Sequence, residues 1–172
     1  MGRYRTPSPK GSKYITREGA AALKRELEYL WRVKRPDVTR AVAEAAAQGD
    51  RSENAEYIYG KKQLAEIDRR VRFLRKRLEG IRVVDDIPPN TDKIYFGAWF
   101  ETRDEHGQQS RFRIVGPDES STAPEYVSMD APLARAVMGK GVRDVVVVKT
   151  PSGERQLVIT AIDYAEKKEP GT

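Results

Sequence analysis

The 172-residue sequence contains no cysteine and only one histidine, His106. The first absence excludes disulfide bonds and thiolate metal sites, and it fits a reducing compartment. A single imidazole makes a poor metal site, so we expect His106 to lie solvated in a turn. No apolar run approaches the length of a membrane span, and the opening segment lacks the apolar core of a secretory signal. We therefore expect a cytoplasmic protein with no membrane partner.

Positive charge is concentrated in the first half of the chain. Up to Asp86 there are 21 Lys and Arg against 13 Asp and Glu, whereas the remainder has 11 against 13. A concentrated positive field favours a polyanionic partner, most often nucleic acid. A solvated basic surface would explain the composition equally well.

Two stretches with a helical hydrophobic period flank a short interruption. The first begins after Thr16, a suitable capping residue, and carries a stripe of Ala20, Leu23, Leu27, Leu30 and Val33 or Lys34. It continues past Pro36, which should bend or locally break the helix because it donates no hydrogen bond. The second stripe comprises Ile58, Ile67, Val71, Leu74, Leu78 and Ile81, mostly spaced like a coiled-coil seam. Facing seams predict an antiparallel helical hairpin with arms of about 30 residues, roughly 45 Å long.

The interruption, QGDRSEN at 48–54, is predicted to form the tip of this hairpin, and Gly49 supplies a backbone that can end a helix. Asp50 and Glu53 in this tip admit two interpretations. In one they form a capping box, with Asp50 as N-cap and Glu53 three residues later. In the other they share a hard cation such as Mg²⁺ inside another protein's active site, where they help a two-metal phosphodiester hydrolysis.

The second helix also carries RRVRFLRKR at 69–77, in which six of nine residues are basic and none is acidic. With Val71 and Leu74 on the seam, the outward face is expected to carry Arg69, Arg70, Arg72, Arg75, Lys76 and Arg77. A helix face of one sign repels itself, whereas a mixed face gains from pairs four residues apart. This pattern favours nucleic acid as the partner of the face.

After a Pro- and Asp-rich linker the pattern changes to strands. Segments 94–103 and 110–116 predict a hairpin, followed by a short strand at 126–130, a short helix opened by Pro132, and two further strands from 144 onward. The valines at 145–148 favour burial on both faces. The fold class is therefore α+β, an N-terminal antiparallel α-helical coiled-coil hairpin followed by a small antiparallel-sheet domain with a short helix. The expected segments are a flexible basic tail (1–13), the hairpin (14–84), a linker (85–92), the sheet domain (93–165) and a tail (166–172).

Four segments, YLWRVKRPDVT at 29–39, GDRSENAEY at 49–57, YFGAWFE at 95–101 and APLARAV at 131–137, closely resemble the bacterial Gre family of transcript cleavage factors, its B type in particular. The resemblance runs from about residue 14 to 164. It implies that the coiled coil enters the secondary channel of RNA polymerase and that an FKBP-like domain docks on the channel rim. It further implies that the polymerase, which remains the enzyme, then cleaves its own backtracked RNA 3′ segment.

The resemblance also assigns residues. Asp50 and Glu53 would help hold the second Mg²⁺ and a water in the polymerase active site, with Ser52 and Asn54 as supporting tip residues. The basic run at 69–77 would hold extruded RNA, and the rim-docking residues would be Asp130, Pro132, Leu133, Ala134 and Arg135. The isolated chain is expected to be a monomer that binds no cofactor.

Three alternatives compete with this interpretation. A polymerase-channel regulator of the same fold that does not promote cleavage is disfavoured by the intact pair of Asp50 and Glu53. A plain RNA-binding coiled coil leaves the two acids unexplained, because carboxylates weaken phosphate binding. A stand-alone nuclease would need more metal ligands than two exposed carboxylates provide.

Overall fold

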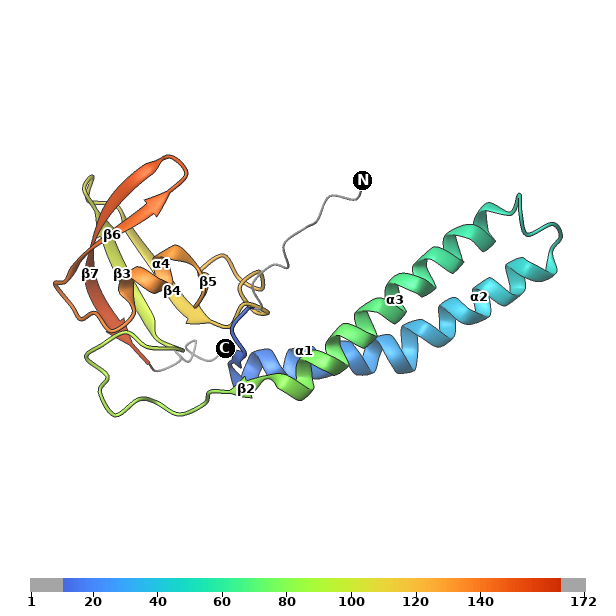
Figure 1. Ribbon diagram of the computed structural model, residues 1–172, viewed down its shortest axis with the longest axis horizontal. Coiled ribbons are helices and arrows are strands. Elements are labelled where there is room, and N and C mark those ends of the chain that lie inside the picture. Colours follow the sequence, from blue (N-terminus) through green and yellow to red (C-terminus); the bar gives the residue numbers. More distant parts are fainter. Residues whose placement is uncertain (1–10, 165–172) are drawn as a thin grey trace, which may run out of the picture. The chain divides into compact units, whose positions relative to one another are not determined.

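The computed structural model describes residues 11–164, which divide into two units (Figure 1). One is helical and spans Glu18–Ile81, and the other contains the described residues up to Arg17 and from Arg82 onward. Two short strands, β1 (Tyr14–Ile15) and β2 (Arg82–Val83), pair in parallel and group with the second unit. No helix in the described part of the chain is long and apolar enough to cross a membrane.

The helical unit has two arms. The first runs through α1 (Arg17–Tyr29), a π-helical turn η1 (Leu30–Lys34) and α2 (Arg35–Ala47), and the second is the single helix α3 (Ala55–Gly80). Pro36 lies in the first turn of α2. The ring of Pro36 displaces the carbonyl four residues earlier, which lies within η1. The π turn therefore falls where Pro36 disturbs the helical hydrogen bonds, and the predicted local break is found there.

Helices α2 and α3 lie antiparallel and side by side (Figure 1). The predicted seam is confirmed at Ile67, Val71 and Leu74, which are buried. Ile58, predicted on the same stripe, is 53% exposed. Gly60, two residues later, is buried against α2 instead. A Cβ added to Gly60 would lie only 2.6 Å from Cγ2 of Val42.

The second unit contains a five-stranded sheet in the order β5-β4-β3-β7-β6. Its strands are β3 (Trp99–Asp104), β4 (Gln109–Val115), β5 (Tyr126–Ser128), β6 (Val145–Thr150) and β7 (Gly153–Asp163). All neighbouring strands are antiparallel except β4 and β5, which pair in parallel, so the sheet is mixed at one edge where an antiparallel sheet was predicted. His106 lies exposed in the β3–β4 turn, as predicted.

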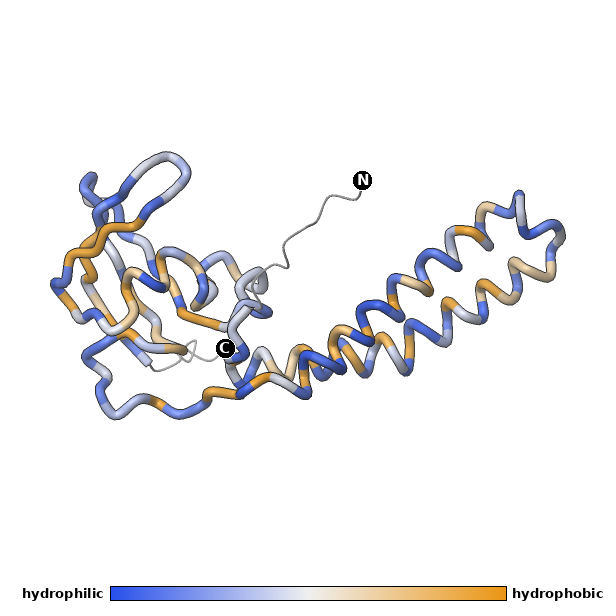
Figure 2. The backbone as a smooth tube through the Cα atoms, in the orientation of Figure 1, coloured by the Kyte–Doolittle hydropathy of each residue, from blue (hydrophilic) through white to orange (hydrophobic). Residues whose placement is uncertain are grey.

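Helix α4 (Pro132–Val137) packs against one face of this sheet, and the core between them contains Ile94, Ala98, Phe100, Ile114, Ala134, Val137, Val146, Val148 and Ile159. Figure 2 shows hydrophobic stretches of backbone gathered in the sheet, with hydrophilic loops around them. The prediction that the valines at 145–148 are buried on both faces is wrong, because Val145 and Val147 are each 52% exposed. They lie on the edge strand β6, whose other face is not covered by α4.

A buried carboxylate ties the start of the chain to the sheet unit. Glu119, 4% exposed, accepts hydrogen bonds from the backbone N–H of Thr16 at 2.9 Å, from the Thr16 hydroxyl, and from the backbone N–H of Gly116 at 3.0 Å. Thr16, expected to cap the first helix, therefore donates to Glu119 immediately before α1 begins. Three donors compensate for the removal of this carboxylate from water.

Candidate functional site

The tip between α2 and α3 is organised by Asn54 and not by Asp50. Asn54 is the N-cap of α3: its Oδ1 accepts from the backbone N–H of Tyr57 at 3.1 Å, and its Nδ2 donates to the carbonyl of Ala45 at 2.8 Å. Because α3 begins one residue after Asn54, Asp50 and Glu53 do not occupy the positions of a capping box. The capping interpretation of the acid pair is therefore wrong.

Asp50 is held by its own local turn. Its Oδ1 accepts from the backbone N–H of Ser52 at 2.9 Å and from the Ser52 hydroxyl at 2.8 Å. The backbone donor first, and then the hydroxyl, lower the pKa of the Asp50 carboxyl below its ordinary value. The preceding Gly49 has a φ of 141°, which favours glycine, so the chain can turn here directly after α2. Asp50 is consequently an exposed carboxylate that is ionised at neutral pH.

Glu53 lies exposed in the same turn, between Ser52 and the capping Asn54. Within residues 11–164, no group of three or more His, Asp and Glu side chains is arranged to hold a metal ion. The donor type nevertheless fits a hard cation, since Mg²⁺ takes one or two carboxylates and fills its remaining positions with water or partner oxygens. A site that uses Asp50 and Glu53 would take those further ligands from outside this chain.

The predicted basic face is only partly open. Arg69, Arg72, Arg75 and Lys76 are exposed, whereas Arg77 is half-buried. Arg70 forms a two-pronged ion pair with Glu26 of α1, with nitrogen–oxygen distances of 2.6 and 2.9 Å. The hydrogen bond from Arg70 lowers the pKa of Glu26 below its ordinary value. Arg70 therefore joins the two arms, which the sequence pattern of α3 alone did not indicate.

An exposed aromatic residue beside this face was not identified from the sequence. Trp31, in η1, is 44% exposed, and the guanidinium of Arg75 lies 4.4 Å from its ring centroid. The sequence did contain a signal for it. The apolar stripe passes through Leu30, so the next residue, Trp31, had to lie off the stripe, where exposure is expected. The basic face and Trp31 together are called the arm surface below, meaning Trp31, Arg69, Arg72, Arg75 and Lys76.

The five residues predicted to dock do not form one open surface. Asp130 accepts hydrogen bonds from the backbone N–H and hydroxyl of Ser12, and Ala134 is fully buried in the core. Leu133 is half-buried, whereas Pro132 and Arg135 are exposed. Of the five, only Pro132 and Arg135 are exposed.

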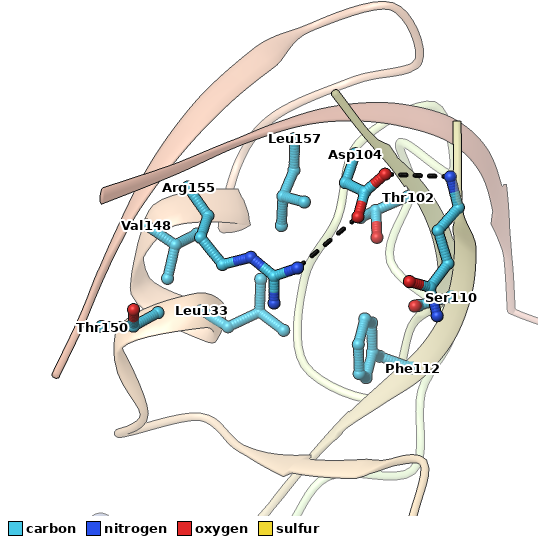
Figure 3. A pocket seen from close by; sticks show the side chains of 10 residues that line it. Thr102, Asp104, Ser110, Phe112, Leu133, Val148, Thr150, Arg155 and Leu157 are labelled. Atoms are coloured by element: carbon cyan, nitrogen blue, oxygen red, sulfur yellow. Dashed lines mark hydrogen bonds and ion pairs between the residues drawn. The ribbon is translucent and has the colours of Figure 1, made fainter. Parts of the chain in front are cut away.

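Leu133 lines a pocket of about 230 Å³, and Figure 3 shows its side chain among those of Phe112, Val148 and Leu157. At the edge of this pocket Arg155 pairs with Asp104 at 3.5 Å (Figure 3). Leu133 thus contributes to the packing between α4 and the sheet, which separates it from the exposed docking candidates.

Comparison with known proteins assigns the chain to a family. The profile described as "Transcription elongation factor, N-terminal" matches residues 13–83, and "Transcription elongation factor, GreA/GreB, C-term" matches residues 88–164. The chain belongs to the GreA/GreB family of transcription elongation factors. The two GreA/GreB profiles together cover nearly all of the described residues, so the resemblance drawn from the four sequence segments is confirmed.

Relatives within the GreA/GreB family cover almost the whole chain. Transcription elongation factor GreB of Pseudomonas aeruginosa is 57% identical over 164 residues, which are 95% of this chain and 98% of that protein. The protein of the same name from Yersinia pestis is 60% identical over 153 residues, 89% of this chain and 90% of that protein. The crystal structure of the GreA factor homolog 1 (Gfh1) protein of Thermus thermophilus is 23% identical with a TM-score of 0.41, covering 88% of this chain and 99% of that one. The two family profiles and the GreB relatives together make the chain a Gre-type transcription elongation factor.

Proposed function

We propose that this elongation factor inserts its helical hairpin into the secondary channel of RNA polymerase and stimulates the polymerase's own cleavage of backtracked RNA 3′ segments. The observation that carries the proposal is the division of roles at the tip. Asn54 caps α3, whereas Asp50 accepts two hydrogen bonds from Ser52 and lies beside an exposed Glu53. The two acids are therefore available for a partner's chemistry, since the fold does not use them as caps.

The length of the arms supports delivery of these acids into a deep site. Helix α3 has 26 residues. At a rise of 1.5 Å per residue it is about 39 Å long. The first arm, from α1 through α2, runs beside it, and the acid pair lies where the two arms end. Carboxylates so placed could reach an active site at the bottom of a channel, where a compact fold would be excluded.

In the proposed site Asp50 and Glu53 would hold a Mg²⁺ that the polymerase also ligates. Once bound, this ion supplies charge stabilisation of the reacting phosphate and lowers the pKa of an attacking water. Ser52 would orient the Asp50 carboxylate through its two hydrogen bonds. Asn54 would fix the loop to α2 through Ala45, so that both acids enter the site in one geometry.

The remaining surfaces receive roles that fit their exposure. We assign the exposed Pro132 and Arg135 to docking on the rim of the channel, and the exposed cations of α3 to holding the extruded RNA. Phosphate neutralisation by Arg and Lys is the dominant source of affinity for single-stranded nucleic acid.

The decisive measurement is the rate at which a backtracked polymerase complex shortens its RNA at saturating factor. We expect the wild-type protein to accelerate cleavage, and the double variant Asp50→Asn/Glu53→Gln to lose most of this effect. Neutral amides are poorer Mg²⁺ ligands, whereas neither change removes a cap of α3 and the amide that replaces Asp50 can still accept from Ser52, so the melting temperature should fall only slightly. Glu56→Gln is the matched control, because Glu56 is an exposed acid in the first turn of α3.

Two other results would contradict the proposal. If the protein slows synthesis without shortening RNA, it is a channel regulator. If the isolated protein cleaves free RNA in Mg²⁺ at a comparable rate, it is a nuclease.

A further inference from the structure

Trp31 is a large apolar side chain that the fold leaves open. Its neighbour Leu30 is 8% exposed and contributes to the seam, whereas Trp31 is 44% exposed. Both residues lie in the π-helical turn η1, a type of turn that occurs often at functional sites. An exposed indole is not unusual by itself. What distinguishes Trp31 is the pair of cations over its ring.

Two cations from different helices hold the indole in place. The guanidinium of Arg75, on α3, lies 4.4 Å from the ring centroid, and that of Arg35, on α2, lies 5.3 Å from it. Arg35 is itself fixed across the hairpin by Asp68, whose carboxylate lies 2.7 Å from Arg35 Nε. The ring is therefore positioned by both arms before any ligand arrives.

The surroundings of the ring carry positive charge. Two exposed cations lie near Arg75 in the sequence of α3. Arg72 precedes it by three residues, and Lys76 follows it directly. No acid lies within 69–77. An indole with guanidinium groups over its ring presents flat stacking surfaces, because bases stack on guanidinium planes as well as on aromatic rings. Together with the exposed cations beside it, it matches two properties of single-stranded nucleic acid, the π face of each base and the anionic phosphate backbone.

We propose that Trp31 and Arg75 form a stacking platform for an unpaired base of single-stranded RNA, with Arg72 and Lys76 holding the adjacent phosphates. This inference rests on the RNA-holding role given above to α3, and it adds an aromatic contact that the basic residues cannot provide. Stacking of this kind tolerates any base, because every base has a π face and no base edge is read.

An RNA segment fits this surface better than an apolar protein segment does. A protein partner packed on Trp31 would also bury Arg75 and its neighbours, and removing unpaired charges from water is costly. RNA phosphates would compensate the same charges directly. The arm surface therefore favours a polyanion that also has flat apolar faces.

The test uses the full-length protein without polymerase and a short fluorescent single-stranded RNA. Base stacking on an aromatic residue is typically worth enough that Trp31→Leu should weaken RNA binding about fivefold or more. Trp31→Phe should keep most of the affinity. An oligomer of equal length that lacks its bases should bind wild type and Trp31→Leu equally, since only the phosphate contacts remain.

Tyr29→Leu is the matched control. Tyr29 is 54% exposed and lies two residues earlier on the same arm, on a different side of the helix. It should leave RNA affinity unchanged. As a second measurement, the fluorescence of Trp31 in a Trp99→Phe background should be quenched by RNA and not by the base-free oligomer. This readout does not require a change at Trp31, so it holds even if Trp31→Leu is poorly folded.

Equal loss of affinity for both oligomers, or no quenching, would overturn the platform. So would a Trp31→Leu variant that binds RNA normally but binds polymerase weakly, because Trp31 would then contact protein. Binding of free RNA is independent of the polymerase assay. A factor that stacks RNA yet fails to stimulate cleavage would refute only the proposed function, and the reverse result would refute only the platform.

Discussion

The side-chain amide of Asn54 donates a 2.8 Å hydrogen bond to the backbone carbonyl of Ala45, which joins the start of α3 to the last turn of α2. The same side chain caps α3 through its oxygen. The Ala45 carbonyl also accepts from the backbone N–H of Gln48 at 3.2 Å, so Asn54 gives this end of α2 a second, shorter hydrogen bond. One residue thus closes both helices at the tip, and the loop with Asp50 is held between them.

Asn54→Asp separates the two roles of this side chain. An aspartate still accepts from the N–H of Tyr57, but it cannot donate to Ala45 and places a negative charge beside that carbonyl. We expect the free energy of unfolding to fall by about 1–2 kcal/mol. Cleavage stimulation should fall as well, whereas affinity for free RNA should not change. Chemical denaturation measures the first effect, and unaltered stability would show that the bond to Ala45 contributes little.

The titration of Asp50 should respond to Ser52. The folded-state pKa of Asp50 is depressed, so its stabilising contribution is present above the unfolded-state pKa and is lost as pH falls through the folded-state pKa. Ser52→Ala removes the hydroxyl donor but keeps the backbone N–H, which is the larger cause of the depression. The pKa of Asp50 should therefore rise only part of the way to its ordinary value. NMR titration of the Asp50 carboxyl carbon measures this, and an unchanged pKa would refute the assigned cause.

Helical periodicity was sufficient to predict the seam of the hairpin, because buried residues must recur on one side of each helix. It was not sufficient near the tip. There, Gly60 lets the backbone of α3 approach Val42 closely, and Ile58 is turned outward. On the first arm, the π turn shifts the register after Leu30. Of the two residues expected next on the stripe, Val33 is 48% exposed and Lys34 is half-buried. Local backbone irregularities of this kind leave little trace in a pattern of apolar residues.

The candidate site was predictable in its residues and less so in their roles. A capping-box pattern fits a helix that starts at Asp50, but Asn54 is an equally good cap, and only the structure shows that α3 starts after it. The pairing of Arg70 with Glu26 joins residues 44 positions apart, which periodicity cannot reveal. Leu133 was assigned to docking by the family resemblance, and a six-residue helix is too short for periodicity to show that this side chain packs against the sheet.

Gly60 and Val42 should be energetically coupled. Gly60→Ala gains up to about 1 kcal/mol of helix propensity, but its Cβ would meet a stiff β-branched side chain at 2.6 Å, and overpacking typically costs about 1–3 kcal/mol. We expect a net loss of about 1 kcal/mol. In a Val42→Ala background the conflict disappears, so the same change should stabilise. A double-mutant cycle from denaturation curves measures the coupling, and simple additivity would contradict the close approach.

Substitutions at Leu133 and Arg135 should have different effects, the first on the stability of the fold and the second on polymerase binding. Leu133→Asp places a carboxylate against Phe112 and Leu157, so we expect the free energy of unfolding to fall by about 2 kcal/mol or more. Arg135→Glu, on an exposed side chain of the same helix, should change it by no more than about 0.5 kcal/mol. If the docking assignment is correct, Arg135→Glu nevertheless weakens polymerase binding in a competition assay. Undiminished binding would place the docking surface elsewhere.

Neutralising the exposed cations of α3 should slow the cleavage of complexes with long extruded RNA more than that of complexes with short extruded RNA. The variant replaces Arg69, Arg72, Arg75 and Lys76 by Gln. All four lie off the buried seam, so the helical signal and melting temperature should be retained. Each lost phosphate contact should reduce the salt dependence of RNA binding by roughly 0.7 in the log–log slope. Cleavage of complexes backtracked by different distances then measures the functional effect.

The matched control for this variant changes the same amount of charge on the first arm, by replacing the exposed Lys24, Arg25, Arg32 and Arg40 with Gln. If net charge alone attracts RNA, both variants should lose affinity and salt slope equally, because long-range attraction depends on the total field. If α3 holds the RNA, only the first variant should lose slope, and its deficit in cleavage should grow with the length of the extruded segment. Equal deficits at every length would refute an RNA-holding role for α3, while leaving the role of Asp50 and Glu53 at the tip intact.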